Sequence, residues 1–348
     1  MALFRRSGPQ PEPAALVLAD RCWDDPELDT AVDAVEDTSK MPDIRIDAAL
    51  DFISRVRDDP ERHVQSVEAM AQRLTRCLDV VRERAQGTEE QRTAAATDAA
   101  ALLATTLVER AWQVRGAGGP DGADPDAADE FLDLLGQADE VAAHALQLDP
   151  EHAPSGCVLL RTALGLSVPA DEWWTRFDAA RRSKPTLYPA HVTMLMALCR
   201  KWYGSQEAMW RFARDVAAAA PEGDPVVAML PLAHAEHFVE LRINPPQQGN
   251  ATDAWELARK QDEDASFAAA LHWLGEDGGQ RLRHPRALEA HQLFGWFFSP
   301  SDPGRARWHL EQAGPRMARY PWRYLSGRPE RSYAKALTAV GIEGIAAP

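Results

Sequence analysis

Hydrophobic residues recur along this chain at spacings of three and four positions. In the segment 173–183 the apolar residues that share this spacing are Trp173, Trp174, Phe177 and Ala180. Such a period puts the apolar side chains on one face of an α-helix, which is then buried against a neighbour. An alternating pattern long enough for a strand is absent from the sequence. The pattern therefore predicts an all-α protein.

Prolines and capping residues divide this pattern into separate helices. Asp171 and Glu172 suit the positive N-terminal end of one helix, and Pro185 and Pro189 are expected to end it. Thr88 to Gln91 has the form of a capping box, which predicts that a helix begins there. The helices expected on these grounds span 24–40, 47–56, 61–86, 88–114, 138–148, 173–183, 190–202, 206–220, 226–243, 251–260, 265–274, 285–298, 303–319 and 331–340.

The middle of the chain repeats itself. Pro150, Pro185 and Pro221 each follow a predicted helix, and they are separated by 35 and 36 positions. A period near 34 residues is typical of tetratricopeptide-type helix pairs. The run from Ala142 to Pro150 is similar to the second helix and exit turn of such a repeat. The sequence therefore predicts a tetratricopeptide-like array of antiparallel helix pairs, an α-solenoid, at least over 127–243.

Three short motifs carry a resemblance to a known group of proteins. They are Ala111-Trp112-Gln113-Val114-Arg115-Gly116, the Leu-Asp-Pro turn at 148–150, and Lys201-Trp202-Tyr203-Gly204-Ser205. Together they resemble an uncharacterised family of bacterial helical-repeat proteins, classed as a domain of unknown function. The resemblance covers roughly Trp112 to Glu240. It implies a tetratricopeptide-like fold and no activity.

Composition shifts suggest a division of the chain. We expect a disordered arm at 1–15, an N-terminal helical region at 16–115, a flexible loop at 116–126, the repeat core at 127–243, a linker at 244–252 and a C-terminal helical region at 253–348. The loop is rich in glycine, proline and aspartate. Its aspartates would repel phosphate, so it is interpreted as a surface loop.

The net charge and the cysteine content indicate which binding partners and which cellular location to expect. The formal net charge is −15 and the isoelectric point about 5.1, which disfavours nucleic acid and anionic membranes as partners. The four cysteines lie far apart without a Cys-x-x-Cys pair, as in a cytoplasmic protein with reduced thiols. The segment 16–18 is too short for a signal peptide, and no segment is long enough to span a bilayer.

His234, His237 and Glu240 form the most metal-like cluster in the sequence. They lie three positions apart, on one face of a predicted helix. Zinc or iron accepts such ligands, although metalloproteases place their histidines four apart. The alternative is a histidine-bearing helix face packed against its neighbour.

Two further sets of residues are candidates for binding. Lys201, Trp202 and Tyr203 could grip a peptide, because aromatic and basic residues dominate binding hot spots. The alternative, favoured by the apolar face of the preceding helix, is that Trp202 fills the core. Between 281 and 335 eleven basic residues outnumber four acidic ones, and many are arginines interleaved with aromatic residues. This end is expected either to cap the array or to dock an acidic partner through Arg316, Arg319 and Arg323.

These observations favour a non-enzymatic protein-interaction scaffold that needs no cofactor and holds a protein or peptide partner in a groove between stacked helices. Gly-x-Ser-x-Gly, Gly-x-Gly-x-x-Gly and P-loop motifs are absent, so no catalytic residue is assigned. One alternative is a metal-dependent enzyme that uses His234, His237 and Glu240. The other is a structural subunit of a larger bacterial assembly.

Overall fold

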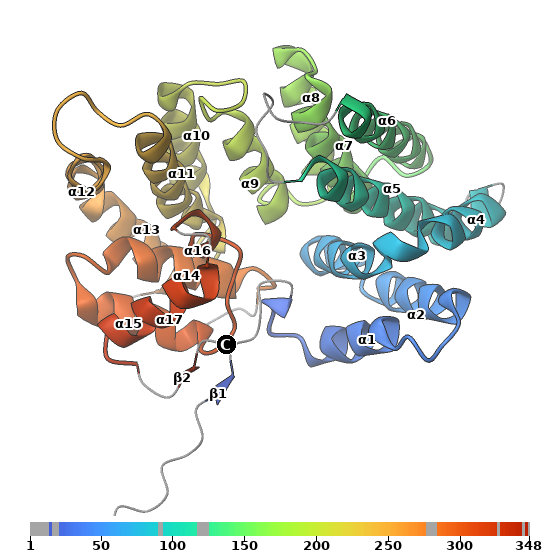
Figure 1. Cartoon of the computed structure of the whole chain (residues 1–348), viewed down its shortest axis with the longest axis horizontal. Coiled ribbons are helices and arrows are strands. Elements are labelled where there is room, and N and C mark those ends of the chain that lie inside the picture. The colour runs from blue at the N-terminus through green and yellow to red at the C-terminus, as the bar shows by residue number, and fades with distance from the viewer. Residues whose placement is uncertain are drawn as a thin grey trace, which may run out of the picture. The chain divides into compact units, whose positions relative to one another are not determined.

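The computed structural model describes residues 14–15, 21–89, 93–116, 125–275, 284–325, 328–342 and 345–346. Helices make up nearly all of this regular structure, which confirms the all-α prediction (Figure 1). The exception is a parallel pairing of two short strands, β1 (Ala14–Ala15) and β2 (Ile345–Ala346). The chain forms two compact units. The first comprises 24–233 and 271–286, and the second 1–23, 234–270 and 287–348.

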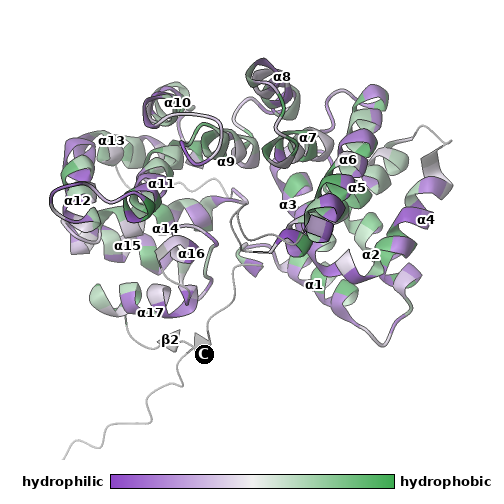
Figure 2. Cartoon of the chain, turned by 45° about the horizontal axis from the view of Figure 1, so that its top comes forward, coloured by the Kyte–Doolittle hydropathy of each residue, from purple (hydrophilic) through white to green (hydrophobic). Residues whose placement is uncertain are grey.

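The first unit holds the N-terminal helices. They are α1 (Pro26–Glu36), α2 (Pro42–Arg55), α3 (Pro60–Leu74), α4 (Leu78–Glu89), α5 (Ala94–Arg115), α6 (Pro125–Leu148), α7 (Ala153–Leu166), α8 (Ala170–Ala180), α9 (Tyr188–Ala197) and α10 (Gln206–Ala219), with the 3₁₀ helices η2 (Thr75–Cys77) and η4 (Pro225–Ala228). Helix α5 packs against α2, α3, α4, α6 and α7, and from α6 to α10 each helix packs on the next. Hydrophobic residues predominate in α9, whereas hydrophilic residues predominate in α4 (Figure 2).

The second unit holds the C-terminal helices. They are α12 (Ala251–Gln261), α14 (Ala287–Phe298), α15 (Pro303–Ala313), α16 (Trp322–Leu325) and α17 (Pro329–Ala339). Helices α11 (Met229–Ile243) and α13 (Glu263–Leu274) each run from one unit into the other. The boundary in α11 falls between Ala233 and His234, so the predicted linker 244–252 lies within the second unit.

Aspartate followed by proline begins two helices of the first unit. The Asp25 carboxylate accepts hydrogen bonds from the amides of Glu27 and Leu28, and Asp59 does the same at the start of α3. A carboxylate at the N-cap satisfies amides that have no partner within the helix, and proline in the first turn loses no hydrogen bond. These local signals fix where α1 and α3 begin.

Glycine allows α7 and α8 to approach closely. A Cβ added to Gly156 would lie 2.5 Å from the Cα of Ala180 and 3.0 Å from its backbone nitrogen. Any side chain at this position would therefore push the two helices apart. Glycine is needed at position 156 because the two backbones meet there, and not because the backbone adopts a left-handed conformation.

The prediction of one continuous helix over 61–86 is wrong. The structure breaks it at η2 into α3 and α4. Thr75 and Cys77 have low helix propensity, and packing decides the path of such a segment. The capping box at Thr88 is also wrong, because α4 continues through Thr88, whose hydroxyl donates to the Ala85 carbonyl. The next helix, α5, is capped instead by Thr93.

Several other helix boundaries in the structure differ from the predicted ones. Helix α7 was not predicted, and its buried face includes Cys157, Leu160 and Leu164. Pro189 lies in the first turn of α9 rather than ending a helix, because a proline there lacks no required hydrogen bond. Helix α9 ends at Ala197, so Trp202 lies in the following turn. The helix predicted to reach residue 319 ends at Ala313, before Gly314 with a φ of 60°.

Two expected flexible segments lie almost entirely outside the described residues. Residues 1–13 of the predicted arm and 117–124 of the predicted loop are not described, and Ala14 and Ala15 form β1.

The second unit is built on buried aromatic side chains. Trp255 of α12 packs against Trp296 of α14, with ring centroids 4.8 Å apart. The indole of Trp322 donates a hydrogen bond of 2.6 Å to the Gln292 side chain, and its ring lies 5.0 Å from that of Tyr333. These contacts join α12, α14, α16 and α17 into one core.

The close approach of α7 and α8 predicts opposite outcomes for two glycine substitutions. Gly156→Ala should lower the free energy of unfolding by about 1–3 kcal/mol, because the added methyl group overpacks the crossing. Gly136→Ala is the matched control in α6, where an added Cβ meets nothing within 4 Å. It should raise stability by about 0.5–1 kcal/mol, since alanine favours the helix. Chemical denaturation measures both, and equal effects of the two substitutions would contradict the close approach.

Candidate functional site

The first unit encloses a polar centre formed by His63, Asp98 and His152, here called the His–Asp–His centre. His63 lies in the first turns of α3, Asp98 in the second turn of α5, and His152 is the residue directly before α7. All three side chains are at most 3% exposed. The caps at Asp59 and Thr93 and the turn before α7 set where these helices start, and the packing of α3, α5 and α7 against one another brings the three side chains together.

One oxygen of Asp98 is the focus of the centre. The Nε2 atoms of His63 and His152 lie 2.9 and 3.0 Å from Asp98 Oδ1. The two imidazole rings meet edge to face, with centroids 5.0 Å apart. The Nδ1 atom of His152 lies 2.9 Å from the Ser155 hydroxyl. The other carboxylate oxygen, Asp98 Oδ2, is buried and has no hydrogen-bond partner in the described structure.

Arg57 connects this centre to the turn before α7. Its Nη1 donates to Asp98 Oδ1 at 2.7 Å, and its Nη2 donates to Asp149 Oδ2 at 2.5 Å and to the Thr97 hydroxyl at 3.0 Å. The guanidinium is planar and presents several donors in fixed directions, which suits two carboxylates at once. Arg57 thus fixes the α2–α3 turn against α5 and the α6–α7 turn.

Burial and hydrogen bonding act in opposite directions on the protonation of the centre. Burial alone raises the pKa of Asp98, but hydrogen bonds from His152 and His63 and the charge of Arg57 outweigh it, so that the pKa of Asp98 lies well below its usual range. Burial lowers the pKa of His152, and the Asp98 carboxylate only partly opposes that effect. Asp98 is therefore a carboxylate, and the neutral form of His152 is favoured.

The three side chains of the centre are of the types that bind metal ions in proteins. Among the described residues, these are the three whose ligand atoms all lie within 4.8 Å of one another. Two imidazole nitrogens and one carboxylate are ligands that zinc, iron and manganese accept. The sequence pattern does not predict this set, because 35 and 54 positions separate its members. The available signal was a charged residue, Asp98, within the alanine- and leucine-rich pattern of α5.

A second buried polar cluster lies near the start of α3. Glu61 is fully buried, and its Oε1 accepts a hydrogen bond of 2.7 Å from the Tyr188 amide. Lys184 Nζ lies 3.3 Å from the same oxygen and 3.0 Å from His284 Nε2. Burial raises the pKa of Glu61, but the hydrogen bond and charge of His284 and the charge of Lys184 outweigh it and lower that pKa. An ammonium group already neutralises this carboxylate.

The predicted metal set of His234, His237 and Glu240 lies on α11. His234 is fully buried against Phe297, with ring centroids 4.9 Å apart, and its Nε2 is 3.4 Å from Asp262. Glu240 accepts a hydrogen bond from Asn244 at 2.9 Å. Among the described residues, these three are not a group whose ligand atoms all lie within 4.8 Å of one another. Metal binding by this set stays a prediction.

The predicted binding residues 201–203 occupy the turn between α9 and α10. Lys201 is exposed and Tyr203 is 44% exposed, while Trp202 is half-buried against Trp112, with centroids 6.2 Å apart. The Tyr203 hydroxyl donates to the Leu164 carbonyl at 2.9 Å. A Cβ on Gly204 would lie 2.0 Å from the Leu198 carbonyl oxygen, so the turn needs glycine there.

The predicted docking arginines follow α15 in the second unit. The guanidinium of Arg316 donates to the Trp23 carbonyl, and its own carbonyl accepts a hydrogen bond of 2.7 Å from Gln292. Arg319 and Arg323 are exposed. The structure thus separates Arg316, which is tied into the unit, from the two arginines that face solvent. Docking by these residues stays a prediction.

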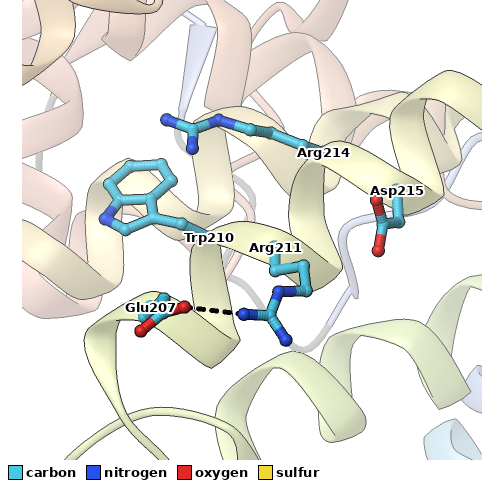
Figure 3. Close-up of a pocket in the computed structure, with 5 residues that line it drawn as sticks. All are labelled: Glu207, Trp210, Arg211, Arg214 and Asp215. Carbon is cyan, nitrogen blue, oxygen red and sulfur yellow. Dashed lines mark hydrogen bonds and ion pairs between the residues drawn. The ribbon is translucent and has the colours of Figure 1, made fainter.

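Partly exposed aromatic side chains gather on α8, on α10 and in the turn between α9 and α10. Trp174 of α8 is 48% exposed and contacts Phe212 of α10, with ring centroids 6.3 Å apart. The outer side of α10 has a hollow of about 370 Å³ lined by Glu207, Trp210, Arg211, Arg214 and Asp215 (Figure 3). There the Arg214 guanidinium lies 5.5 Å from the Trp210 ring centroid. We call Trp174, Tyr203, Trp210 and Arg214 the α8–α10 surface.

Comparison with known proteins returned no match to a family model, a curated protein or a solved structure. Among the described residues, no helix combines the length and the apolar composition that a bilayer-spanning segment needs.

The geometry around Arg57 predicts a large loss of stability on its removal. Arg57→Ala should lower the free energy of unfolding by about 3–5 kcal/mol, because Asp98 would keep a buried charge without its guanidinium. Arg211→Ala is the matched control, since its ion pair with Glu207 is more than two-thirds exposed on both sides. That change should cost about 1 kcal/mol or less. Urea unfolding of both variants measures the difference, and similar midpoints would show that Asp98 does not depend on Arg57.

Burial of His191 predicts that stability depends on pH. His191 packs among Phe177 and Phe212, and its Nδ1 donates to the Leu187 carbonyl at 2.8 Å. Burial lowers its pKa, and that hydrogen bond only partly opposes the effect. As the pH falls below about 6.5, the unfolded chain binds a proton before the folded one does, so stability is lost.

His191→Gln should therefore reduce the slope of unfolding free energy against pH between pH 7 and 5, by at most about 1.4 kcal/mol per unit. His144→Gln, at an exposed position of α6, is the control. If the two variants keep the same slope, His191 is not held neutral by the fold.

Proposed function

We propose that this chain is a non-enzymatic protein-interaction scaffold of the helical-repeat type. The observation that carries the proposal is the exposure of the α8–α10 surface. Trp174 and Tyr203 are more than a third exposed, unlike the other large aromatic side chains of the described structure. Exposed aromatic residues beside arginine are the composition of binding hot spots, whereas a folded chain gains by burying them.

A tetratricopeptide-like arrangement of α7 to α10 is part of this proposal. Two helices lie between Pro150 and Pro185, and two more between Pro185 and Pro221. This agrees with one helix pair per period of about 34 residues, as the resemblance to the bacterial repeat family implies. In such an array, successive pairs present equivalent helices side by side, as the contact between Trp174 of α8 and Phe212 of α10 requires.

The proposed partner is a protein segment that packs apolar side chains against the exposed part of Trp174. The surface carries both signs of charge, from Arg211 and Arg214 and from Glu207 and Asp215, so it offers an apolar contact with a polar rim. Lys201 and Tyr203 extend the surface toward the turn before α10. Exposed Arg319 and Arg323 are a separate proposed contact for an acidic partner. A cytoplasmic location goes with this proposal.

Site-directed photo-crosslinking in the host cell tests the proposal. A photoreactive amino acid at position 174 should give a discrete adduct that the same residue at position 132 does not, because Leu132 is an exposed position of α6 outside the surface. With the purified partner, Trp174→Ala should weaken binding by about 2 kcal/mol, or roughly 30-fold in Kd. Its effect on unfolding free energy should be about 1 kcal/mol, since only about half of the Trp174 side chain is covered in the folded chain.

Leu132→Ala should leave the Kd unchanged. The proposal fails if position 174 yields no adduct beyond that of position 132, or if Trp174→Ala binds the partner as tightly as the unaltered chain does.

A further inference from the structure

The geometry points to a divalent transition-metal site at the His–Asp–His centre, in which the ion bridges α3, α5 and the start of α7. The two imidazole Nε2 atoms both face Asp98, at 2.9 and 3.0 Å from its Oδ1. Ligand atoms on a tetrahedral zinc ion lie roughly 3.3 Å apart, given bonds of about 2.0–2.1 Å. The observed separations are a few tenths of an ångström shorter, so a small outward shift makes room for an ion.

The hydrogen-bond partner of His152 supports metal ligation. Its Nδ1 lies 2.9 Å from the Ser155 hydroxyl, which can accept a hydrogen bond from the Nδ1–H group. In this tautomer Nε2 carries a lone pair that faces the carboxylate oxygen, and a cation between the two atoms makes the contact favourable. Without an ion, the other tautomer donates from Nε2 to Asp98 and accepts from Ser155. Histidines that bind metals usually have such a partner on the other ring nitrogen, which fixes the tautomer.

Asp98 Oδ2 supplies a second, independent observation. This oxygen is buried, belongs to a side chain that is 1% exposed, and has no hydrogen-bond partner in the described structure. A buried acceptor without a partner is costly and calls for an explanation, for which an ion is one of the standard candidates. Arg57 and both histidines contact Oδ1, and an ion held by this carboxylate would supply the partner that Oδ2 lacks.

The surrounding charges are compatible with a divalent ion. The charged groups at the centre are Arg57, Asp98 and Asp149, whose formal charges sum to one excess negative charge. Arg57 pairs with Asp149 as well as with Asp98, so its guanidinium competes less strongly with a metal ion for the Asp98 carboxylate. The buried cluster of Glu61, Lys184 and His284 differs on this point, because an ammonium group already occupies the place a metal would take.

Burial assigns the ion a structural rather than a catalytic role. His63, Asp98 and His152 leave no exposed face for a substrate. An ion that is bound by residues of separate helices contributes to folding free energy. The ion would hold together the starts of three helices in the first unit. This inference goes beyond the proposed scaffold function and does not depend on it.

Metal analysis of full-length, untagged chain tests the site. Mass spectrometric element analysis should find about one zinc, iron or manganese ion per chain. After treatment with a chelator, adding ZnCl₂ at about 100-fold excess over its Kd should raise the Tm by roughly 5 °C or more. His63→Gln and His152→Gln should abolish both results, and His144→Gln, at an exposed histidine, should change neither.

Ser155→Ala removes the partner of His152 and no ligand. It should weaken zinc binding by about 10–100-fold, because such supporting contacts orient the ligand. If the serine only fills space, zinc affinity will be unchanged and the assignment of the His152 tautomer is wrong.

A measurement on the unaltered chain covers the case in which the histidine variants do not fold. X-ray absorption of chain loaded with Co²⁺ should show imidazole nitrogen among the nearest neighbours. The metal site is overturned if the untagged chain retains no transition metal and Zn²⁺, Mn²⁺ and Co²⁺ all leave the Tm unchanged. It is also overturned if folded His63→Gln and His152→Gln bind the metal as the unaltered chain does, or if Co²⁺ has only water-like oxygen neighbours.

Discussion

Asp98 carries a negative charge inside a helix whose other side chains are mostly alanine, leucine and threonine. Taking a carboxylate out of water costs several kcal/mol, which only well-placed donors or cations can offset. Those donors come from His63, His152 and Arg57, on three other segments of the first unit. The packing of α2, α3, α5 and α7 against one another must therefore satisfy this single charge.

The need for hydrogen bonds to the buried Asp98 carboxylate selects one arrangement of the helices. Apolar contacts between α3 and α5 tolerate small shifts along the helix axes, because hydrophobic burial is non-directional. Hydrogen bonds to one carboxylate oxygen do not, since they weaken steeply with distance and angle. Glu61 imposes a similar condition on the contact between α3 and the segment around Lys184 and Tyr188. Helix α3 thus contributes two polar contacts that fix its register in the first unit.

The buried centre and the exposed surface have different physical roles. The α8–α10 surface consists of side chains that are partly in contact with solvent, so a partner can reach them directly. The His–Asp–His centre is inaccessible, so its effect on any partner is indirect, through the stability of the first unit. In the second unit the contact of Arg316 with Trp23 shows the same distinction, because a basic side chain there holds the unit together while Arg319 and Arg323 face solvent.

The sequence by itself determined the helical class, because the three- and four-residue period is a local property of the chain. It also determined features set by neighbouring residues, such as the N-cap at Ser205, whose side chain accepts from the Ala208 amide. It did not determine the break at 75–77 or the end of α9 at Ala197, where local preference is weak and packing decides. Only the tertiary structure brought His63, Asp98 and His152 together, since residues 35 and 54 positions apart leave no local pattern. The same holds for the exposure of Trp174. A spacing pattern places that residue beside Trp173, which is buried, and only the neighbouring helix decides which of the two side chains is covered.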